Sequence, residues 1–426
     1  MDGEKLNLVL LGDIMLGRYV DDEFELPQRK IAAFGDVLPL IHQYDPAHTI
    51  VAGNLECAVT RHAVATPKAF NFKLHPSHAG VLTQLGLGYV SLANNHVLDY
   101  GQEGLAETHE LGLGYVSPAN NHVLDYGQEG LAETHEVLDA LGVAHSGSGT
   151  LAEAAAPAFV IKGGYKVAFL SYSDHYEDWA AGPERPGINF IDPANFKTEE
   201  LQQQVAAARA AGADLVLGFV HWGPNWRWRP DGSLQRLGRT LLAAGADLVF
   251  GHSAHHIQGV QVVHGRPIIY GAGGFIDDYA TEEEYRNDLG CVWVAEFSPA
   301  AAAAAAGGTT SHHDTAPSDG SSSRDQHTAG SSSSSSSSSA AKHRALQLQS
   351  LRAVPTRIHH DWREGVRHSE PGCGSPPYVS QVDLAHGAAY EWVAAKLAAL
   401  SAEWGTAVVP LPHEGGLLLL GQGQQA

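Results

Sequence analysis

The sequence predicts an α/β fold in which buried strands alternate with helices. Strand-like runs such as 6–11 and 214–220 end abruptly in polar residues, as buried parallel strands do. Helical patterns follow several of these runs, for example at residues 233–244. The hydrophobic content of 44% can fill a sizeable core. The 426 residues therefore suit one large domain with insertions, or two to three smaller domains.

The balance of charge restricts the classes of partner. A formal net charge of −21 argues against nucleic acid and against an anionic membrane, because both require clustered Lys and Arg. An anionic small molecule or polymer stays possible as a substrate, since a bound metal ion can reverse the local field. The sequence does not predict the oligomeric state.

Cysteine usage and hydropathy lead us to expect a cytoplasmic protein. The three cysteines, Cys57, Cys291 and Cys373, are widely spaced and form neither a disulfide framework nor a CxxC zinc motif. We find no signal-peptide pattern before the first apolar run. No apolar run approaches the roughly 18 residues that a membrane-spanning helix needs, so we expect no direct membrane insertion.

The first part of the chain predicts two strands and two helices. The strands are Leu6–Leu11 and Thr49–Ala52, and each ends in a polar segment. A helix is expected around 31–44 and another at 76–85, with a loop at 60–76 before the second.

A tandem repeat follows. Residues 111–136 repeat residues 85–110 with a single change, Leu92 to Pro118. Each copy predicts a buried strand, a polar end containing Asn-Asn-His, and a helix. The helix of the second copy is expected to continue to Leu141 and to pack on the sheet.

Only one copy can contribute its strand to the sheet. Pro118 lacks an N–H and would remove a hydrogen bond from a central strand. We therefore expect Asn95 and His96 of the first copy to line the site, rather than Asn121 and His122. Replacing His96 and His122 one at a time would decide between the copies.

The second half of the chain continues the alternation of strands and helices. A hairpin is expected at Gly163-Gly164, between strands 158–161 and 166–172. Residues 174–198 predict a loop. The remaining expected elements are helices 199–211 and 233–244 and strands 214–220, 247–250, 259–263, 267–271 and 290–297.

Composition divides the chain into three segments. Residues 1–298 form the main domain, and residues 299–344 are a low-complexity stretch rich in Ala, Ser and His that we expect to be a disordered insertion. Residues 345–426 are too few for a thick core of their own, so we expect them to return to the same domain. Within them we expect an edge strand at 345–351, a helix at 388–404, and a small hairpin formed by the runs around 408 and 417–420.

Several strand-like runs end in residues of the types that bind metal ions. In open α/β sheets such endings converge beyond the carboxyl ends of the strands. Carboxylate and amide oxygens together with imidazoles suit Zn, Mn or Fe better than Mg or Ca, and a pair of ions could activate a water molecule. We therefore predict one or two bound divalent metal ions. The strand-end residues are Asp13, Glu56, Asn95 with His96, His221, and His252 with His255.

Each of these residues also has a purely structural explanation. Asp13 could be a helix N-cap, and His221 could be a packed, half-buried histidine. Asn94 and Asn95 could be turn residues. The cluster of histidines in 252–256 at one strand end favours a ligand role by itself, and the convergence of several strand ends favours the site as a whole.

The motifs at these strand ends resemble the CapA family of capsule-synthesis proteins, and they occur in the family's order. The resemblance covers about residues 6–298 and the segment after the insertion. It implies a metallophosphoesterase-like, four-layer α/β/β/α sandwich and an association with poly-γ-glutamate capsule synthesis. The matching motifs are Asp13–Arg18, Asn54–Glu56, Leu92–His96 with Asp99–Gly101, His221–Gly223, Gly251–His255 with Gln258-Gly259, and Gly265–Tyr270 with Gly274–Asp277.

The resemblance also implies roles for individual residues. Asp13 and His255 would bind one metal ion, Glu56 would bridge two ions, and His96 would be the catalytic general acid or transition-state stabiliser. The second ion would be bound by Asn95, His221 and His252. Arg18, Lys73 and Asn94 would bind an anionic substrate.

Two departures from the usual phosphoesterase pattern leave the function open. Met15 stands where a histidine is usual, and Glu56 replaces the usual bridging aspartate; His256 also leaves the choice between His255 and His256 open. We predict a metal-dependent hydrolase acting on phosphoester or γ-glutamyl-type bonds. The alternatives are a non-catalytic accessory protein of a polymer synthesis or export complex, and a metal-free module that binds anions through Arg18 and Lys73.

Overall fold

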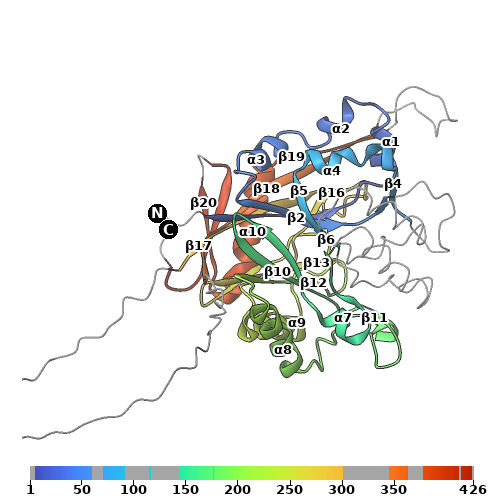
Figure 1. The fold of residues 1–426 in the computed structure, drawn as a ribbon. Helices are drawn as coiled ribbons and strands as arrows, with labels where there is room; N and C mark the ends of the chain where they lie inside the picture. The colour runs from blue at the N-terminus through green and yellow to red at the C-terminus, as the bar shows by residue number, and fades with distance from the viewer. Residues whose placement is uncertain are drawn as a thin grey trace, which may run out of the picture.

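Two β-sheets form the framework of the fold in this computed structural model (Figure 1). The structure describes residues 5–59, 71–91, 115–116, 144–175, 177–300, 345–362, 378–411 and 414–424. The fold is mixed α/β, as the sequence predicts. The predicted insertion lies almost wholly outside the described residues.

The first sheet contains nine strands. They are β1 (Leu6–Ile14), β2 (Thr49–Leu55), β5 (Leu87–Ser91), β16 (Gly274–Ile276), β17 (Leu289–Pro299), β18 (Leu346–Trp362), β19 (Tyr378–Leu384), β20 (Ala407–Leu411) and β21 (Gly416–Leu420). Their order is β20-β21-β18-β17-β1-β2-β5, with β16 paired to β1 and β19 paired to β18. Strands β1, β2 and β5 run parallel, so their carboxyl ends meet at one edge.

The second sheet contains six strands in the order β14-β15-β13-β12-β10-β9. Strands β10, β12, β13 and β15 run parallel. The predicted hairpin joins β9 to β10, with both Gly163 and Gly164 at positive φ, as a tight two-residue turn requires. The strands are β9 (Ala158–Lys162), β10 (Tyr165–Ser173), β12 (Leu215–His221), β13 (Leu248–His252), β14 (Val260–Val263) and β15 (Arg266–Ile269).

Three further pairs of short strands lie outside these sheets. They are β3 (Ala58–Val59) with β4 (Lys73–Leu74), β6 (Tyr115–Val116) with β7 (Ala144–His145), and β8 (Ser148–Gly149) with β11 (Gly187–Ile188).

The tandem repeat contributes to two different strand pairings. Strand β5 belongs to the first copy and pairs with β2 in the main sheet, whereas β6 belongs to the second copy and pairs with β7. The first copy therefore occupies the position beside β2. The predicted helices of both copies lie outside the described residues.

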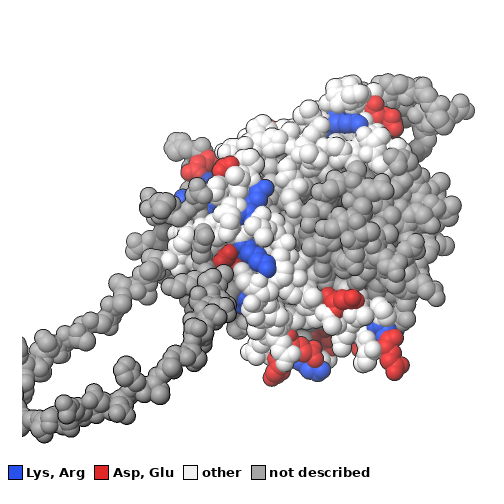
Figure 2. All heavy atoms as spheres, in the orientation of Figure 1, with Lys and Arg blue, Asp and Glu red and all other residues white. Residues whose placement is uncertain are grey.

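Charged side chains of both signs are scattered over the face shown in Figure 2. The described residues on this face do not gather into one broad basic patch. Among the described helices, none is both long and apolar enough to cross a membrane.

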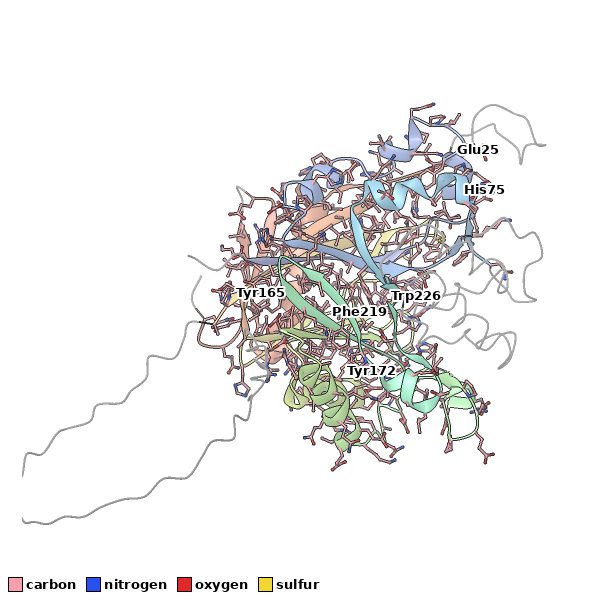
Figure 3. All side chains as sticks on the ribbon, in the orientation of Figure 1. Glu25, His75, Tyr165, Tyr172, Phe219 and Trp226 are labelled. Carbon is pink, nitrogen blue, oxygen red and sulfur yellow. The ribbon has the colours of Figure 1, made fainter. Side chains whose placement is uncertain are left out.

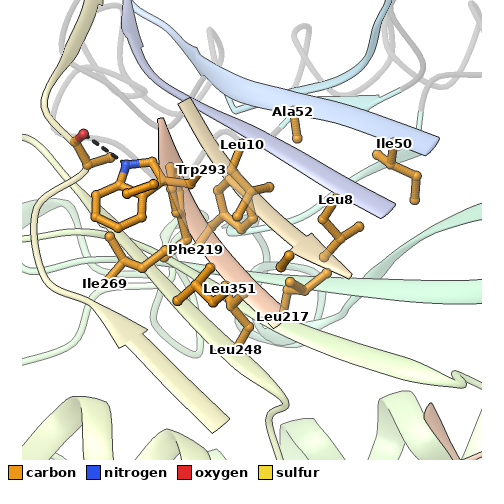
Figure 4. Close-up of a cluster of buried hydrophobic side chains, with 14 of the residues drawn as sticks. Leu8, Leu10, Ile50, Ala52, Leu217, Phe219, Leu248, Ile269, Trp293 and Leu351 are labelled. Atoms are coloured by element: carbon orange, nitrogen blue, oxygen red, sulfur yellow. Dashed lines mark hydrogen bonds between the residues drawn. The ribbon is translucent and has the colours of Figure 1, made fainter. Parts of the chain in front are cut away.

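The main core lies between the two sheets. Phe219 of β12 is fully buried there and faces Leu8 and Leu10 of β1 in the same cluster (Figures 3 and 4). The Trp293 indole is also buried and donates to Ala272 O at 3.1 Å, which satisfies its one polar group. Truncating an aromatic side chain in such a core costs about 3–5 kcal/mol.

Helices cover the outer faces of both sheets. On the first sheet, apolar residues of α3 and α4 join Val9 and Leu11 in one cluster. On the second sheet, α8 and α9 pack against Val216 and Val220. The helices here are α1 (Tyr19–Glu23), α2 (Arg29–Ala32), α3 (Val37–His42), α4 (Gly80–Gln84), α8 (Thr198–Ala210) and α9 (Gly232–Ala244).

The sequence of α9 explains both its position and its ends. Its buried residues recur at helical spacing along one face, from Leu234 to Leu242. The Asp231 carboxylate caps the first turn by accepting from two backbone N–H groups, and Gly245 ends the helix at positive φ.

The remaining helices are short except for one near the C-terminus. Helix α10 (Gly387–Ser401) places Val393 and Leu397 in the core between the sheets, so the segment after the insertion belongs to the same core. The others are α7 (Leu151–Ala155) and the 3-10 helices η1 (Pro76–His78), η2 (Glu177–Trp179) and η3 (Ala402–Trp404).

The structure differs from the sequence-based elements at several places. The helix predicted at 31–44 is interrupted at Gly35, which is at positive φ and where an added Cβ would lie 1.8 Å from Asp383 Oδ1. The edge strand predicted at 345–351 is the start of β18, where residues 346–350 pair only with β17. The strand continues beyond the predicted end to Trp362, and β21 and β19 pair with it on its other side from Leu351 onward. Strand β16 was missed because it is only three residues long.

Candidate metal centre

Asp13 is held at the carboxyl end of β1 by groups from two neighbouring segments. Its N–H donates to Gly273 O at 3.1 Å, and Asn54 Nδ2 on β2 donates to Asp13 Oδ1 at 2.7 Å. The chains approach so closely that a Cβ at Gly12 would lie 1.8 Å from Gly273 O, so only glycine fits there. These contacts fix the orientation of the Asp13 carboxylate.

Glu56 follows β2 and lies beside Asp13. Its N–H donates to Ile14 O at 2.9 Å, which ties the end of β2 to the end of β1. The side chain is fully buried, and Oε1 has no hydrogen-bond partner among the described residues. A buried, unpaired carboxylate oxygen is costly in a protein interior unless it binds a ligand such as a metal ion.

His255 completes a cluster with these two carboxylates. Its Nδ1 lies 3.1 Å from Asp13 Oδ2 and 3.7 Å from Glu56 Oε2. The three ligand atoms lie within 4.8 Å of one another. The turn after β13 reaches this position through two residues at positive φ, Ser253 and His255 itself, a strained conformation typical of functional sites.

His221 and His252 form a second group. They end β12 and β13 as register partners, and their Nδ1 atoms lie 3.2 Å apart. Two imidazole nitrogens bound tetrahedrally to one zinc ion would lie about 3.3 Å apart. His252 Nε2 is buried and has no hydrogen-bond partner among the described residues. The pair therefore has the spacing of two ligands of one ion.

Burial and mutual attraction set the charges of the carboxylates. Burial opposes ionisation of Asp13, but its hydrogen bond and attraction to His255 hold its pKa below the usual value. Burial raises the pKa of Glu56 to about 8, despite the attraction of His255. Without a metal ion, the cluster therefore keeps a proton that a bound cation would displace.

The histidines differ in charge. Burial lowers the pKa of His252 to about 4, so its imidazole is neutral at neutral pH and available as a ligand. Burial opposes the charge on His255 as well, but Glu56 and Asp13 raise its pKa to about 9. The charges of Asp13 and His255 both influence the pKa of His252. The carboxylate cluster and the His221–His252 pair are therefore close enough to interact electrostatically.

These residues fit a centre for one or two divalent ions. They combine carboxylate oxygens with imidazole nitrogens, a set that suits zinc, manganese or iron. The unpaired Oε1 of Glu56 supports the same assignment for the carboxylate group. Asp13, Glu56 and His255 would hold one ion, and His221 and His252 would hold the other.

Met15 does not belong to this centre. It is buried in the core beneath the outer helices, and its Sδ accepts from Gly17 N–H at 3.1 Å. The first group, made of Asp13, Glu56 and His255, therefore offers three possible protein ligands among the described residues.

His256 points away from the carboxylates. Its Nδ1 lies 3.0 Å from Ile257 O, and its ring packs against Trp226 and Trp228. His255 is thus the histidine of this turn that lies with Asp13 and Glu56.

The predicted substrate-binding cations differ in their surroundings. Arg18 contacts both carboxylate oxygens of Asp278 and lies over the Phe72 ring, 4.7 Å from its centroid, so its charge is already paired. Lys73 lies on β4 with its backbone against Gly17. Substrate binding by either remains a prediction.

The Asn-Asn-His segment of the repeat is not among the described residues. The predicted roles of Asn94, Asn95 and His96, and the choice between His96 and His122, therefore remain predictions.

Sequence reasoning missed three residues near the centre. Tyr279 OH lies 3.4 Å from Glu56 Oε2, and its ring packs edge-on against His255. Asp277 is buried, which raises its pKa to about 7. His175 packs edge-on against His221. It follows the end of β10, so the strand-end rule used for the other ligands could have found it.

The structure defines a class of protein: a mixed α/β fold with a candidate metal centre at the carboxyl ends of parallel strands. The family described as "Bacterial capsule synthesis protein PGA_cap" matches residues 7–112 and 109–279, which is more than half of the chain. The chain belongs to this family.

Several curated relatives carry related names. The chain is 28% identical to a probable polyglutamine synthesis accessory protein of Mycobacterium tuberculosis, over 68% of this chain and 72% of that one. It is 28% identical to the PGA biosynthesis protein CapA of Bacillus subtilis, over 64% and 63%. It is also 28% identical to the capsule biosynthesis protein CapA of Bacillus anthracis, over 65% and 61%.

The two family matches meet inside the tandem repeat. The first ends at 112 and includes residues 85–110, and the second begins at 109 and includes residues 111–136. Each match thus contains one copy of the Asn-Asn-His segment, which indicates that one copy is additional to the family pattern.

Proposed function

We propose that this protein is a metal-dependent hydrolase with the four-layer metallophosphoesterase-like fold, acting on γ-glutamyl-type amide or phosphoester bonds in the synthesis of a polyglutamate or capsule polymer. The observation that carries the proposal is the convergence of Asp13, Glu56 and His255 beside the His221–His252 pair. These residues come from the ends of four strands, β1, β2, β12 and β13, and no packing requirement brings so many ionisable groups into one buried place.

The chain's own residues would bind and orient the reacting groups. When bound, the metal ions would supply a water of lowered pKa and polarise the bond to be cleaved. Asn54 holds the Asp13 carboxylate, and Tyr279 lies against Glu56, so both carboxylates are positioned before a ligand arrives. The neutral imidazole of His252 is ready to bind without losing a proton.

The resemblance to the CapA family implies a substrate built from glutamate, and two relatives are named for PGA biosynthesis and for capsule biosynthesis. A polyglutamate chain carries negative charge, and this protein has a formal net charge of −21. Binding therefore requires local positive charge, which the bound metal ions would supply.

A non-catalytic accessory role is the second candidate. Met15 leaves the first group with three protein ligands, and the Mycobacterium relative is named an accessory protein. Such a protein would keep the fold but bind less than one ion per chain.

Metal analysis and turnover together test the proposal. We expect one or two Zn, Mn or Fe ions per chain and hydrolysis of γ-linked polyglutamate or of a generic phosphodiester. Asp13→Asn and His252→Ala should each lose metal and activity, whereas His386→Ala, at an exposed histidine before α10, should keep both. Less than one ion per chain together with no turnover would favour the accessory role.

A further inference from the structure

A short segment beside the metal centre alternates tryptophan and arginine. Residues Trp226, Arg227, Trp228 and Arg229 lie between β12 and α9. Both indoles are half-buried and both guanidinium groups are exposed. Such a concentration of cations is unusual in a chain with 26 Lys and Arg against 47 Asp and Glu.

The two indoles are fixed by neighbouring rings. Trp226 stacks on His256 at 6.1 Å between centroids, and Trp228 stacks on Tyr285 at 5.0 Å. Gln258 Nε2 donates to Arg227 O at 2.7 Å and holds the backbone between them. The segment is therefore a preformed surface of aromatic faces.

These residues line a cavity of about 440 Å³. Its walls are Trp226, Arg227, Trp228, Arg229 and Tyr285. Trp226, labelled in Figure 3, also lies near the candidate metal ligand His255, with ring centroids 6.4 Å apart. A ligand held at the metal centre could thus extend past Trp226 into this cavity.

Two cations here form no ion pair within 4.0 Å among the described residues, although Arg227 lies near enough to Asp231 to help lower the pKa of that carboxyl. One is Arg227, and the other is Lys396, whose Nζ lies 3.9 Å from the Trp228 ring centroid. Arg229 is instead paired with Glu403. The exposed glutamates 282–284 precede Tyr285 and would repel an anion at that side, so an anion would enter beside Arg227 and Lys396.

We propose that the segment 226–229, with Tyr285 and Lys396, is a subsite that binds a flexible chain bearing repeated carboxylates outside the metal centre. This inference rests on the proposed function for the identity of the chain. In γ-linked polyglutamate, methylene groups alternate with carboxylates. The methylenes would pack on the exposed parts of the two half-buried indoles, and the carboxylates would meet the planar guanidinium of Arg227 and the ammonium of Lys396.

Binding without turnover tests the subsite. Full-length, chelator-treated protein, which cannot turn the ligand over, would be titrated with a γ-linked glutamate oligomer, with calorimetry and tryptophan fluorescence as the two measurements. We expect Arg227→Gln and Lys396→Gln each to raise Kd about tenfold, as loss of a charge-assisted hydrogen bond does. Arg227→Lys keeps the charge but not the planar fork, so it should recover part of the affinity.

A matched control separates the subsite from the overall charge. Lys197→Gln changes the net charge equally at an exposed position before α8 and should leave Kd unchanged. Equal Kd values for Arg227→Gln and the unaltered protein would overturn the subsite. Tighter binding of inorganic polyphosphate than of the glutamate oligomer would overturn the carboxylate assignment.

The same experiments distinguish this inference from the proposed function. If the protein neither retains metal nor hydrolyses any substrate, but Arg227→Gln still weakens oligomer binding, the subsite stands and the hydrolase proposal fails. If the protein hydrolyses its substrate while neither substitution changes oligomer binding, the hydrolase proposal stands and the subsite fails.

Discussion

The Nδ1 atoms of His221 and His252 lie 3.2 Å apart at the ends of two paired strands. Both side chains are buried, and this contact is within hydrogen-bond distance, which is also the spacing of two imidazole ligands of one ion. Their spacing and burial are explained together if one cation binds between them.

This relationship predicts how metal ions affect stability. A ligand that binds only the folded state stabilises it by about 2.7 kcal/mol when its free concentration is roughly 100 times Kd. We therefore expect Zn or Mn to raise the Tm of the chelator-treated protein. His252→Ala should reduce this rise strongly, while His386→Ala should not. An equal rise in His252→Ala would show that the ions bind elsewhere.

Metal binding should also release protons. Glu56 and His255 have pKa values of about 8 and about 9, so both hold protons at pH 7 in the metal-free protein. A cation displaces those protons, and its affinity should therefore rise from pH 6 to pH 9. Calorimetry in buffers of different ionisation enthalpy measures the number released. A pH-independent affinity with no proton release would contradict the assignment of these two ligands.

The same pKa of Glu56 predicts a stability change without metal. The folded state holds this proton up to about pH 8, whereas the unfolded carboxyl loses it near its ordinary value. Between the pKa of Glu56 in the unfolded chain and its pKa of about 8 in the folded state, the folded state binds more protons than the unfolded state. The free energy of unfolding that Glu56 contributes is therefore lost as the pH rises through this range. The free energy of unfolding of chelator-treated protein can be measured with urea at pH 6 and pH 8. It should fall less between these two pH values in Glu56→Gln than in the unaltered protein.

The strand-end rule predicted much of the candidate site from sequence. Asp13, Glu56, His221 and His252 all lie at or just beyond the carboxyl ends of parallel strands, where polar residues interrupt an apolar run. The rule works because burial on both faces makes such strands apolar throughout, so their polar ends are visible in the sequence.

Other features depend on contacts that the sequence does not encode locally. The split between α2 and α3 occurs where Gly35 approaches Asp383, a residue distant in the chain. The positions of Asp277 and Tyr279 depend on β16, a strand of three residues that carries no periodic pattern. Tertiary packing decides these features, and local propensity cannot reveal them.

Tyr279 is expected to support the metal centre from outside the ligand set. Its hydroxyl contacts Glu56, and removing the partner of a metal-binding carboxylate typically lowers metal affinity about 10- to 100-fold. Tyr279→Phe should therefore bind metal more weakly with little change in the stability of the metal-free protein. Tyr44→Phe, which loses a hydrogen bond with Arg352 elsewhere, is the control. Unchanged metal affinity would show that Tyr279 is a packing residue only.

The assignment of the first repeat copy to the sheet gives the last prediction. Tyr89 on β5 is buried and stacks on Phe169 of the second sheet at 4.1 Å between centroids. Tyr89→Ala should lower the free energy of unfolding by about 3–5 kcal/mol, as loss of a buried aromatic side chain does. Tyr115→Ala changes the equivalent residue of the second copy and should cost much less, because β6 lies outside both main sheets. Urea denaturation measures both. A larger loss for Tyr115→Ala would mean that the second copy occupies the position beside β2, and His122 would then replace His96 as the expected catalytic residue.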